Sequence, residues 1–407
     1  MNLLSKIVLV IGIILLPFSY IRLVSNFSIS DLFFLLSFIF GLAVQFKHKG
    51  LIREKINSNI FLLSITIYSF GFIISANSSF YPYDSIFSFF QVLFIFIIIY
   101  YSFSFQEISY SFIRNCLYLL ALFSSIITFF MFLFYLTGVD YSSGFFFIKQ
   151  GWGMNRFSYG TMEPNITARI MAQNIPIIIF FILNKPKWSF RLINIFILLL
   201  LLSIIILTAS RSGLLIVIFG IFLYFVFYFR MNKNYNILKY FIFMFLIFFL
   251  VGTLFQMYPN FFESAFNRYS TIIDYNFSAS SKQRLFVFDQ SLDMINNSVL
   301  IGKGMGNSAN FTGTAVHNPV IISWLENGFF GFIGFLSIYL ILFYYVIINY
   351  RNKFFNDYML MVLSLIAIMM IIGDMFMANS YKRSLWVPAI MFIIYSKQKL
   401  KIHFKNK

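Results

Sequence analysis

Residues 194–229 read NIFILLLLLSIIILTASRSGLLIVIFGIFLYFVFYF, two long apolar runs divided by the short polar segment TASRS. A run of about 20 apolar residues can cross a hydrocarbon core of roughly 30 Å as an α-helix. Such runs recur along the chain, in which 60% of residues are hydrophobic and 11% are charged. The sequence therefore predicts an all-α polytopic membrane protein with no room for a large soluble domain.

We expect about twelve transmembrane helices within a single integral membrane domain, residues 1–407. The expected spans are 7–24, 31–46, 59–76, 85–105, 113–137, 165–183, 191–208, 213–229, 239–257, 319–347, 358–378 and 384–396. The first run is long, lacks a small-residue cleavage site and leads into another apolar run. We therefore interpret it as an uncleaved span and not as a signal peptide.

Basic residues concentrate in alternate connections and in the C-terminal tail, which the positive-inside rule places in the cytoplasm. Both termini are then cytoplasmic, and the number of spans is even. The net charge of +17 sets orientation on this interpretation, and we expect no nucleic-acid partner. Cys116 is the single cysteine, so the chain offers no intramolecular disulfide and no thiolate metal cluster.

The same orientation places connections 138–164 and 258–318 on the outer side, where long loops commonly carry function. Within the longer one, residues 281–295 predict a helix lying along the membrane surface. Its predicted apolar face consists of Leu285, Phe288, Leu292 and Ile295. The glycine-dense turn 302–307 follows, for which a flexible re-entry into the membrane and a phosphate-cradling loop are both open interpretations.

His317 lies where this long loop meets the tenth predicted span, whereas His48 and His403 fall in basic cytoplasmic segments. An imidazole at the outer surface can accept a proton from a sugar hydroxyl near neutral pH, or it can merely anchor a helix end. Pro319 suits a first helical position. Glu326 lies inside the apolar run, where a carboxylate normally faces a partner or a wet cavity. Small residues recur beyond it and would let another helix approach closely, at Gly328, Gly331 and Gly334.

Several arginines fall on the outer side against the general charge bias: Arg156, Arg169, Arg211, Arg268, Arg284 and Arg383. Asn165, Arg169 and Gln173 recur at intervals of four residues, a polar stripe that should face the protein interior. Arg211 occupies a very short turn, and Arg284 lies on the predicted surface helix. Guanidinium groups gathered at a membrane boundary suit a lipid diphosphate, while any single one can instead snorkel to the interface.

The segment beginning His317-Asn318, continued after nine residues by Gly328 and then by Gly331, resembles the H-N-x9-G-x-x-G pattern of a known family. That family is the O-antigen ligase and Wzy-type polymerase superfamily. Ser210-Arg211-Ser212-Gly213 resembles its Ser-Arg turn, and the layout of spans extends the resemblance over most of the chain. The Arg-x10-Gly motifs of some polymerases are absent from the long loop: eleven positions beyond Arg284 stands Ile295.

The resemblance implies a GT-C-like membrane glycosyltransferase that uses an undecaprenyl-diphosphate-linked glycan as donor, without a metal or another cofactor. His317 would be the catalytic base or orient the acceptor hydroxyl, and Arg169, Arg211 and Arg284 would bind the diphosphate. Supporting positions are assigned to Asn165, Asn318, Glu326, Gly328 and Gly331. Membrane lipids and a chain-length regulator of the Wzz type are the further partners implied.

The preferred function is polymerisation of lipid-linked repeat units into O-antigen or capsular polysaccharide on the outer side of the membrane. The alternative is ligation of the polymer to lipid A-core, which would use the same outer histidine and arginines. A flippase or transporter is a second alternative, but it would favour internal repeats and polar groups near the midplane. A transporter should also keep its function when His317 is replaced.

Overall fold

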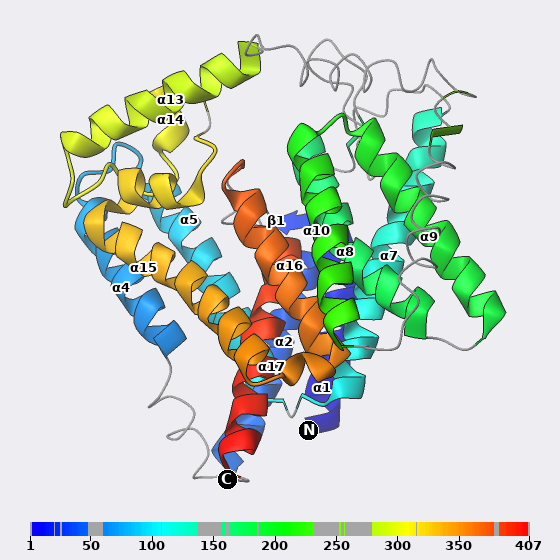
Figure 1. Cartoon of the computed structure of the whole chain (residues 1–407). Coiled ribbons are helices and arrows are strands. Elements are labelled where there is room, and N and C mark those ends of the chain that lie inside the picture. Colours follow the sequence, from blue (N-terminus) through cyan, green and yellow to red (C-terminus); the bar gives the residue numbers. More distant parts are fainter. Residues whose placement is uncertain are drawn as a thin grey trace.

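The structure is a computed structural model that describes residues 2–19, 21–24, 27–47, 60–106, 108–136, 157–158, 163–184, 187–231, 252–253, 256, 279–314, 316–377 and 382–405. These residues form a bundle of long helices (Figure 1). The longer helices are α1 (Asn2–Leu15), α2 (Ile29–Lys47), α4 (Ile60–Ala76), α5 (Pro82–Leu93), α7 (Tyr110–Leu136), α8 (Pro164–Asn184), α9 (Trp188–Leu207), α10 (Arg211–Met231), α13 (Ala279–Asn296), α15 (Pro319–Arg351), α16 (Tyr358–Asp374) and α17 (Arg383–Lys405).

Short elements complete the description. They are the turns η1 (Leu16–Phe18), η2 (Phe94–Ile99) and η3 (Phe354–Asn356), the helices α6 (Tyr100–Ser104) and α14 (Ser308–Thr312), and the strands β1 (Arg22–Val24) and β2 (Phe27–Ser28). The two strands pair antiparallel, with Arg22 opposite Ser28 and Val24 opposite Phe27. This ribbon lies within a segment for which the sequence predicted only helix and connection.

The all-α polytopic membrane fold is confirmed. Among the described residues, 7 helices are long and apolar enough to cross a membrane, and α1 with η1, α4 and α16 are shorter apolar helices. Every predicted span except 239–257 coincides with a helix. That exception falls almost wholly outside the described residues, as do most of 138–164 and the first part of 258–318. The count of twelve spans therefore stays a prediction.

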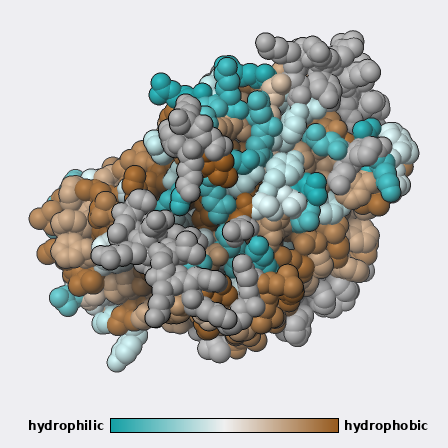
Figure 2. Space-filling view, turned by 90° about the horizontal axis from the view of Figure 1, so that it is seen from below, coloured by the Kyte–Doolittle hydropathy of each residue, from teal (hydrophilic) through white to brown (hydrophobic). Residues whose placement is uncertain are grey.

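The two ends of the chain lie on the same side of the bundle, and α13 with α14 covers the opposite side, called here the α13 side (Figure 1). This agrees with an even number of crossings. Seen from the side of the termini, hydrophilic residues extend over the middle and upper part of the face, and hydrophobic residues lie to the left and the lower right (Figure 2). Apolar flanks beside a polar end face are expected of a bundle held in lipid.

Helix α8 lies inside the bundle, in contact with α7, α9, α10 and α16. All of its residues from Ile166 to Ile182 are buried. The burial of Arg169 and Gln173 confirms that the predicted polar stripe faces the protein interior. A guanidinium at that position needs internal partners, because neither lipid nor water reaches it.

Helices α4 and α15 pack closely along each other through glycines. A Cβ atom on Gly71 would lie 2.4 Å from the backbone nitrogen of Gly331, and one on Gly334 would lie 2.4 Å from that of Tyr68. These distances are shorter than any allowed contact, so only glycine permits this approach. The predicted role of Gly331 and Gly334 in close helix packing is confirmed.

The glycine-dense turn 302–307 packs against a kink in α15 and is hydrogen-bonded to it. Gly328 interrupts the helix with φ 63° and ψ −161°, a conformation open to glycine. The backbone N–H groups of Lys303 and Gly304 donate to the carbonyl groups of Leu325 and Glu326 at 2.8 and 2.9 Å. Because these two amides bond the helix, they are not available to a phosphate, and the turn serves as a packed connector.

Candidate functional site

His317 lies at the α13 side, immediately before α15. The side chain of Asn318 accepts hydrogen bonds from the backbone N–H groups of Val320 and Ile321 at 2.9 and 3.2 Å and so caps the helix. Pro319 takes the first helical position, as the sequence predicted. The cap fixes the chain direction one residue beyond His317. Asn318 therefore orients the histidine through the backbone.

A cavity of about 390 Å³ opens beside this histidine. It is lined from three parts of the chain by Arg284, Leu285, Val287, Phe288, Val316, His317, Asn318, Met375 and Phe376. We call it the His317 cavity. A base and a cation thus share one mostly apolar cavity, the usual composition of a small-molecule site.

Helix α13 lines one side of the His317 cavity, and its bounds confirm that residues 281–295 are helical. That this helix lies along the membrane surface stays a prediction. The predicted apolar face is correct only in part. Val287 and Ile295 are buried against Val316 and Leu325. Leu285 and Phe288 instead keep 52% and 40% of their surface exposed and line the cavity. The edge with Val287 and Ile295 therefore packs α13 against the protein. The edge with Leu285 and Phe288 faces the cavity.

The electrostatics of the cavity are unusual for a histidine. Burial and the nearby Arg284 cation lower the pKa of His317 from 6.5 to about 4. Burial also lowers the pKa of the Arg284 guanidinium, and the Arg211 cation acts in the same direction, while Glu163 opposes them. At neutral pH the imidazole is therefore uncharged and able to accept a proton. The Arg284 cation beside it can attract an anion.

Arg211 reaches this region from the turn between α9 and α10. That turn is as short as predicted: α9 ends at Leu207 and α10 begins at Arg211. Ser210 accepts a hydrogen bond from the backbone N–H of Gly213 at 3.2 Å, which closes the first turn of α10. The sequence predicted Arg211 and Arg284 on the same side of the membrane, and the structure places them within electrostatic reach of each other.

Arg169 has a different set of partners. Its guanidinium forms an ion pair with Asp374 at 2.6 Å and donates to the carbonyl groups of Met370 and Met377 at 3.3 and 3.0 Å. Tyr339 donates to the other carboxylate oxygen of Asp374 at 2.6 Å. The side chains of Arg169 and Asp374 are 2% and 4% exposed. These bonds engage the guanidinium inside the protein, and Arg169 is not among the residues that line the His317 cavity.

Glu326 is buried and points into the glycine-dense turn. Its carboxylate accepts a hydrogen bond from the backbone N–H of Ser308 at 3.2 Å. The expectation that this carboxylate has a protein partner is confirmed, and the partner is backbone. Glu326, Gly328 and Gly331 thus shape the start of α15 and lie outside the lining of the His317 cavity.

A comparison with protein families finds a match over part of the chain. Residues 195–336 match the model of a family described as O-antigen ligase. This part of the chain is similar to the O-antigen ligase and Wzy-type polymerase superfamily. The match includes Arg211, Arg284 and His317, and it ends before Asp374. No curated protein matches the chain in a search of such proteins.

This similarity supports a function of the ligase or polymerase type in O-antigen biosynthesis, with glycosyltransferase-like activity on lipid-linked glycans at a coarse level. The many apolar helices make the chain a multi-pass membrane protein. Neither observation separates a polymerase from a ligase.

The sequence did not predict the acidic residues that pair with Arg169 and Arg383. Asp374 stands inside the predicted span 358–378, where the cost of a buried charge gave the same signal as for Glu326. Asp31 pairs with Arg383 at 2.7 Å, so this outer arginine also has a protein partner. Arg156 and Arg268 lie outside the described residues.

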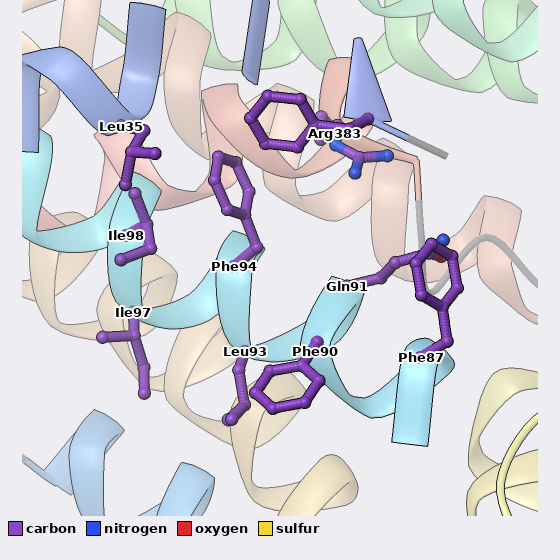
Figure 3. Close-up of a pocket in the computed structure, with 10 residues that line it drawn as sticks. Leu35, Phe87, Phe90, Gln91, Leu93, Phe94, Ile97, Ile98 and Arg383 are labelled. Atoms are coloured by element: carbon purple, nitrogen blue, oxygen red, sulfur yellow. The ribbon is translucent and has the colours of Figure 1, made fainter. Parts of the chain in front are cut away.

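A second cavity, of about 450 Å³, lies between α2, α5, η2 and α17 (Figure 3). Apolar side chains form nearly all of its lining, and the polar members are Gln91 and Arg383. It offers no base for the chemistry of the superfamily. The His317 cavity is therefore the candidate active site.

Proposed function

We propose that this protein transfers a glycan from a lipid diphosphate carrier to a sugar hydroxyl at the His317 cavity. The observation that carries the proposal is the placement of Arg284 and His317 in the lining of one cavity at the α13 side. A lipid-linked glycan presents its diphosphate at the membrane surface and its sugars beyond it. Both reacting groups then reach a site on the rim of the bundle, where neither has to enter the hydrocarbon layer.

In the proposed step, the acceptor hydroxyl oxygen forms a bond to the anomeric carbon of the donor sugar. The bond from that carbon to the diphosphate oxygen breaks, and the electron pair leaves with the diphosphate. His317 accepts the hydroxyl proton through its uncharged imidazole, a role that its low pKa permits at neutral pH. The proton later passes to the departed diphosphate or to water, which restores the base.

Arg284 and Arg211 would bind the diphosphate and stabilise the charge that develops on it as it leaves. Burial lowers the pKa of Arg284 most, and repulsion by the Arg211 cation lowers it further. A diphosphate between them would relieve that repulsion. Because the guanidinium groups supply the positive charge, we propose a step without a metal ion or another cofactor.

For Arg169 we propose a positioning role in place of the direct diphosphate contact expected from the sequence. Its bonds to Asp374 and Met377 hold the chain on both sides of Met375 and Phe376. Those two residues line the His317 cavity opposite α13. Arg169 would thus act through the backbone of the cavity wall, with Asn165 beginning the same helix.

The acceptor we propose is a second lipid-linked repeat unit, which makes the protein an O-antigen or capsular polysaccharide polymerase. Ligation to lipid A-core is the second candidate, favoured by the description of the matching family. We place the α13 side outside the bacterial inner membrane and both termini in the cytoplasm, because the basic residues concentrate in the other connections. A chain-length regulator of the Wzz type is the proposed protein partner.

The test is the surface glycan of a strain that lacks the gene and carries either the wild-type protein or His317→Ala. A polymerase predicts loss of the ladder, with a single repeat unit still attached to lipid A-core. A ligase predicts loss of all attached glycan, with polymer accumulating on the carrier lipid. An unchanged ladder would contradict glycan transfer at His317 and would leave the flippase interpretation standing.

A further inference from the structure

The second cavity has one polar end and one apolar end. Arg383 and Gln91 lie toward one side of it, and Leu35, Ile97 and Ile98 lie at the other (Figure 3). Its volume of about 450 Å³ falls within the range of roughly 300–1,000 Å³ typical of small-molecule sites. A ligand that fits this lining is an amphiphile with a long apolar part.

The direction of the cavity follows from the helices that line it. Ser85, near the start of α5, donates to the carbonyl of Met305 at 2.8 Å, so this end of α5 lies against the glycine-dense turn at the α13 side. From Phe87 the lining continues along α5 and η2 to Ile98, deeper in the bundle by about 16 Å at 1.5 Å per helical residue. Arg383, the first residue of α17, lies 5.9 Å from the ring of Phe94, and Ile98 follows further along η2. The polar end therefore lies nearer the α13 side than the apolar end at Ile98 does.

A π-helical turn shapes the wall of the cavity. Residues Phe94–Ile99 form η2, a π-helical irregularity of a kind that is frequent at functional sites. Phe94 packs edge-on against Phe27 of β2 at a ring distance of 5.8 Å, and the Arg383 guanidinium lies 5.9 Å from the Phe94 ring. Three elements distant in the sequence thus meet at the polar end.

The ion pair at this end presents its cationic member to the cavity. Asp31 is fully buried and also accepts hydrogen bonds from the backbone N–H and the hydroxyl of Ser28 at 2.8 and 2.9 Å. The Arg383 side chain is 12% exposed and lines the cavity, whereas Asp31 does not. An anionic group at the cavity mouth would meet the guanidinium, which pairs well with phosphate oxygens.

We propose that this cavity binds one acyl chain of an anionic phospholipid from the leaflet on the α13 side, with the lipid phosphate at Arg383. The chain would fill the apolar end near Ile98, at the depth where lipid chains are the surrounding solvent. Among the described residues, the two cavities share no lining residue. The proposed occupant is a lipid other than the glycan donor, and the test below includes the carrier lipid as a competitor.

The test uses the purified full chain in bilayers of phosphatidylcholine that contain a trace of a photoactivatable lipid. The probe is phosphatidylglycerol with a diazirine in its acyl chain, and a phosphatidylcholine with the same chain is the neutral comparison. We expect phosphatidylglycerol to label the peptide containing residues 87–98 several-fold more than the neutral probe does. Unlabelled phosphatidylglycerol should suppress this labelling in the wild-type protein, which needs no variant.

Two variants locate the chain and the head group. Ile98→Trp fills the apolar end and should lower the labelling several-fold, whereas Phe222→Trp, on a residue of α10 that is 62% exposed, should leave it unchanged. The double variant Asp31→Asn/Arg383→Gln removes both charges without leaving either one buried alone, and it should abolish the preference for the anionic probe.

Three results would overturn the proposal. Equal labelling by the two probes would remove the recognition of phosphate, and equal labelling of Ile98→Trp and Phe222→Trp would place the chain outside the cavity. Suppression by undecaprenyl phosphate, at amounts where phosphatidylglycerol has no effect, would assign the cavity to the carrier lipid. None of these outcomes bears on the role of His317, so the two proposals fail separately.

Discussion

Two arginines that look alike in the sequence have different environments in the structure. Arg169 and Arg284 were both predicted on the outer side of a membrane bundle, and both were expected to bind a diphosphate. Arg169 is buried and bonded to a carboxylate and two carbonyl groups. Arg284 lines a cavity beside His317, and the charges that act on it are those of the Arg211 cation and of Glu163.

The difference teaches which arginine a ligand can use. A guanidinium whose donors are satisfied inside the protein gains little from a phosphate and loses much if its partners are broken. A guanidinium that faces other cations gains from any anion that enters. The Arg169 cluster should therefore control stability, and the Arg284 cavity should control activity.

Replacing His317 tests the cavity most severely. We expect His317→Ala to reduce glycan transfer by about 10²–10⁴-fold, the usual contribution of a general base. The midpoint of thermal unfolding should stay near that of the wild type, because the half-buried imidazole fills the edge of a cavity. His403→Ala is the matched control, since that ring packs on Phe354 at the other end of the protein. Retained transfer in His317→Ala would contradict the role of His317 as the base.

Replacing Arg169 should act on folding. Arg169→Leu leaves the Asp374 carboxylate buried without its cation, which costs roughly 3–5 kcal/mol of stability. The double variant Arg169→Leu/Asp374→Leu should recover much of this loss, because it removes both charges together. Thermal unfolding in detergent measures both variants. A stable Arg169→Leu protein that has lost transfer would instead mean that Arg169 acts mainly on the site and not on folding.

The sequence predicted most of the fold because lipid imposes a strong and local requirement. Apolar length alone located the helices of the predicted spans within the described residues, and the glycines at 331 and 334 indicated a close helix neighbour. The ribbon of β1 and β2 was not predicted, since so short a pairing leaves no pattern of alternation. Helix α15 continues to Arg351, beyond the predicted end of the span at 347.

The site was predicted less completely, because ionic partners are set by packing. Asp374 lies 205 residues beyond Arg169, and nothing in either segment names the other. The proximity of Arg284 to His317 likewise depends on how α13 folds back over α15. Local signals identified His317 and its cap Asn318, and only the structure separated the arginine of the cavity from the arginine of the interior.

Replacing Arg284 sharpens this separation. Arg284→Gln should lower transfer by about 10-fold to 100-fold, as expected from the loss of charged hydrogen bonds of about 1.5–3 kcal/mol. Its unfolding midpoint should change little. Lys282→Gln removes a charge from an exposed position on the same helix and should leave transfer near the wild-type level. Equal losses in the two variants would mean that the general positive charge of α13 matters, and not the position of one guanidinium.

The smallest expected effect is a shift in the pH dependence of transfer. His317 acts as a base only when uncharged, and its pKa in the free protein is lowered to about 4, first by burial and then by Arg284. The specificity constant kcat/KM should therefore stay level as pH falls from 7 and decline only near pH 4. In Arg284→Gln the cation no longer opposes protonation, so the pKa rises toward its ordinary value of 6.5 and the decline begins at higher pH. Measurement of kcat/KM against pH for both proteins gives the shift directly.

The Arg169→Leu/Asp374→Leu protein should keep the wild-type profile, since neither residue lines the His317 cavity. An identical profile in Arg284→Gln would mean that the two side chains do not interact, and the cavity would then lose the coupling between donor binding and base strength that distinguishes it from the buried cluster.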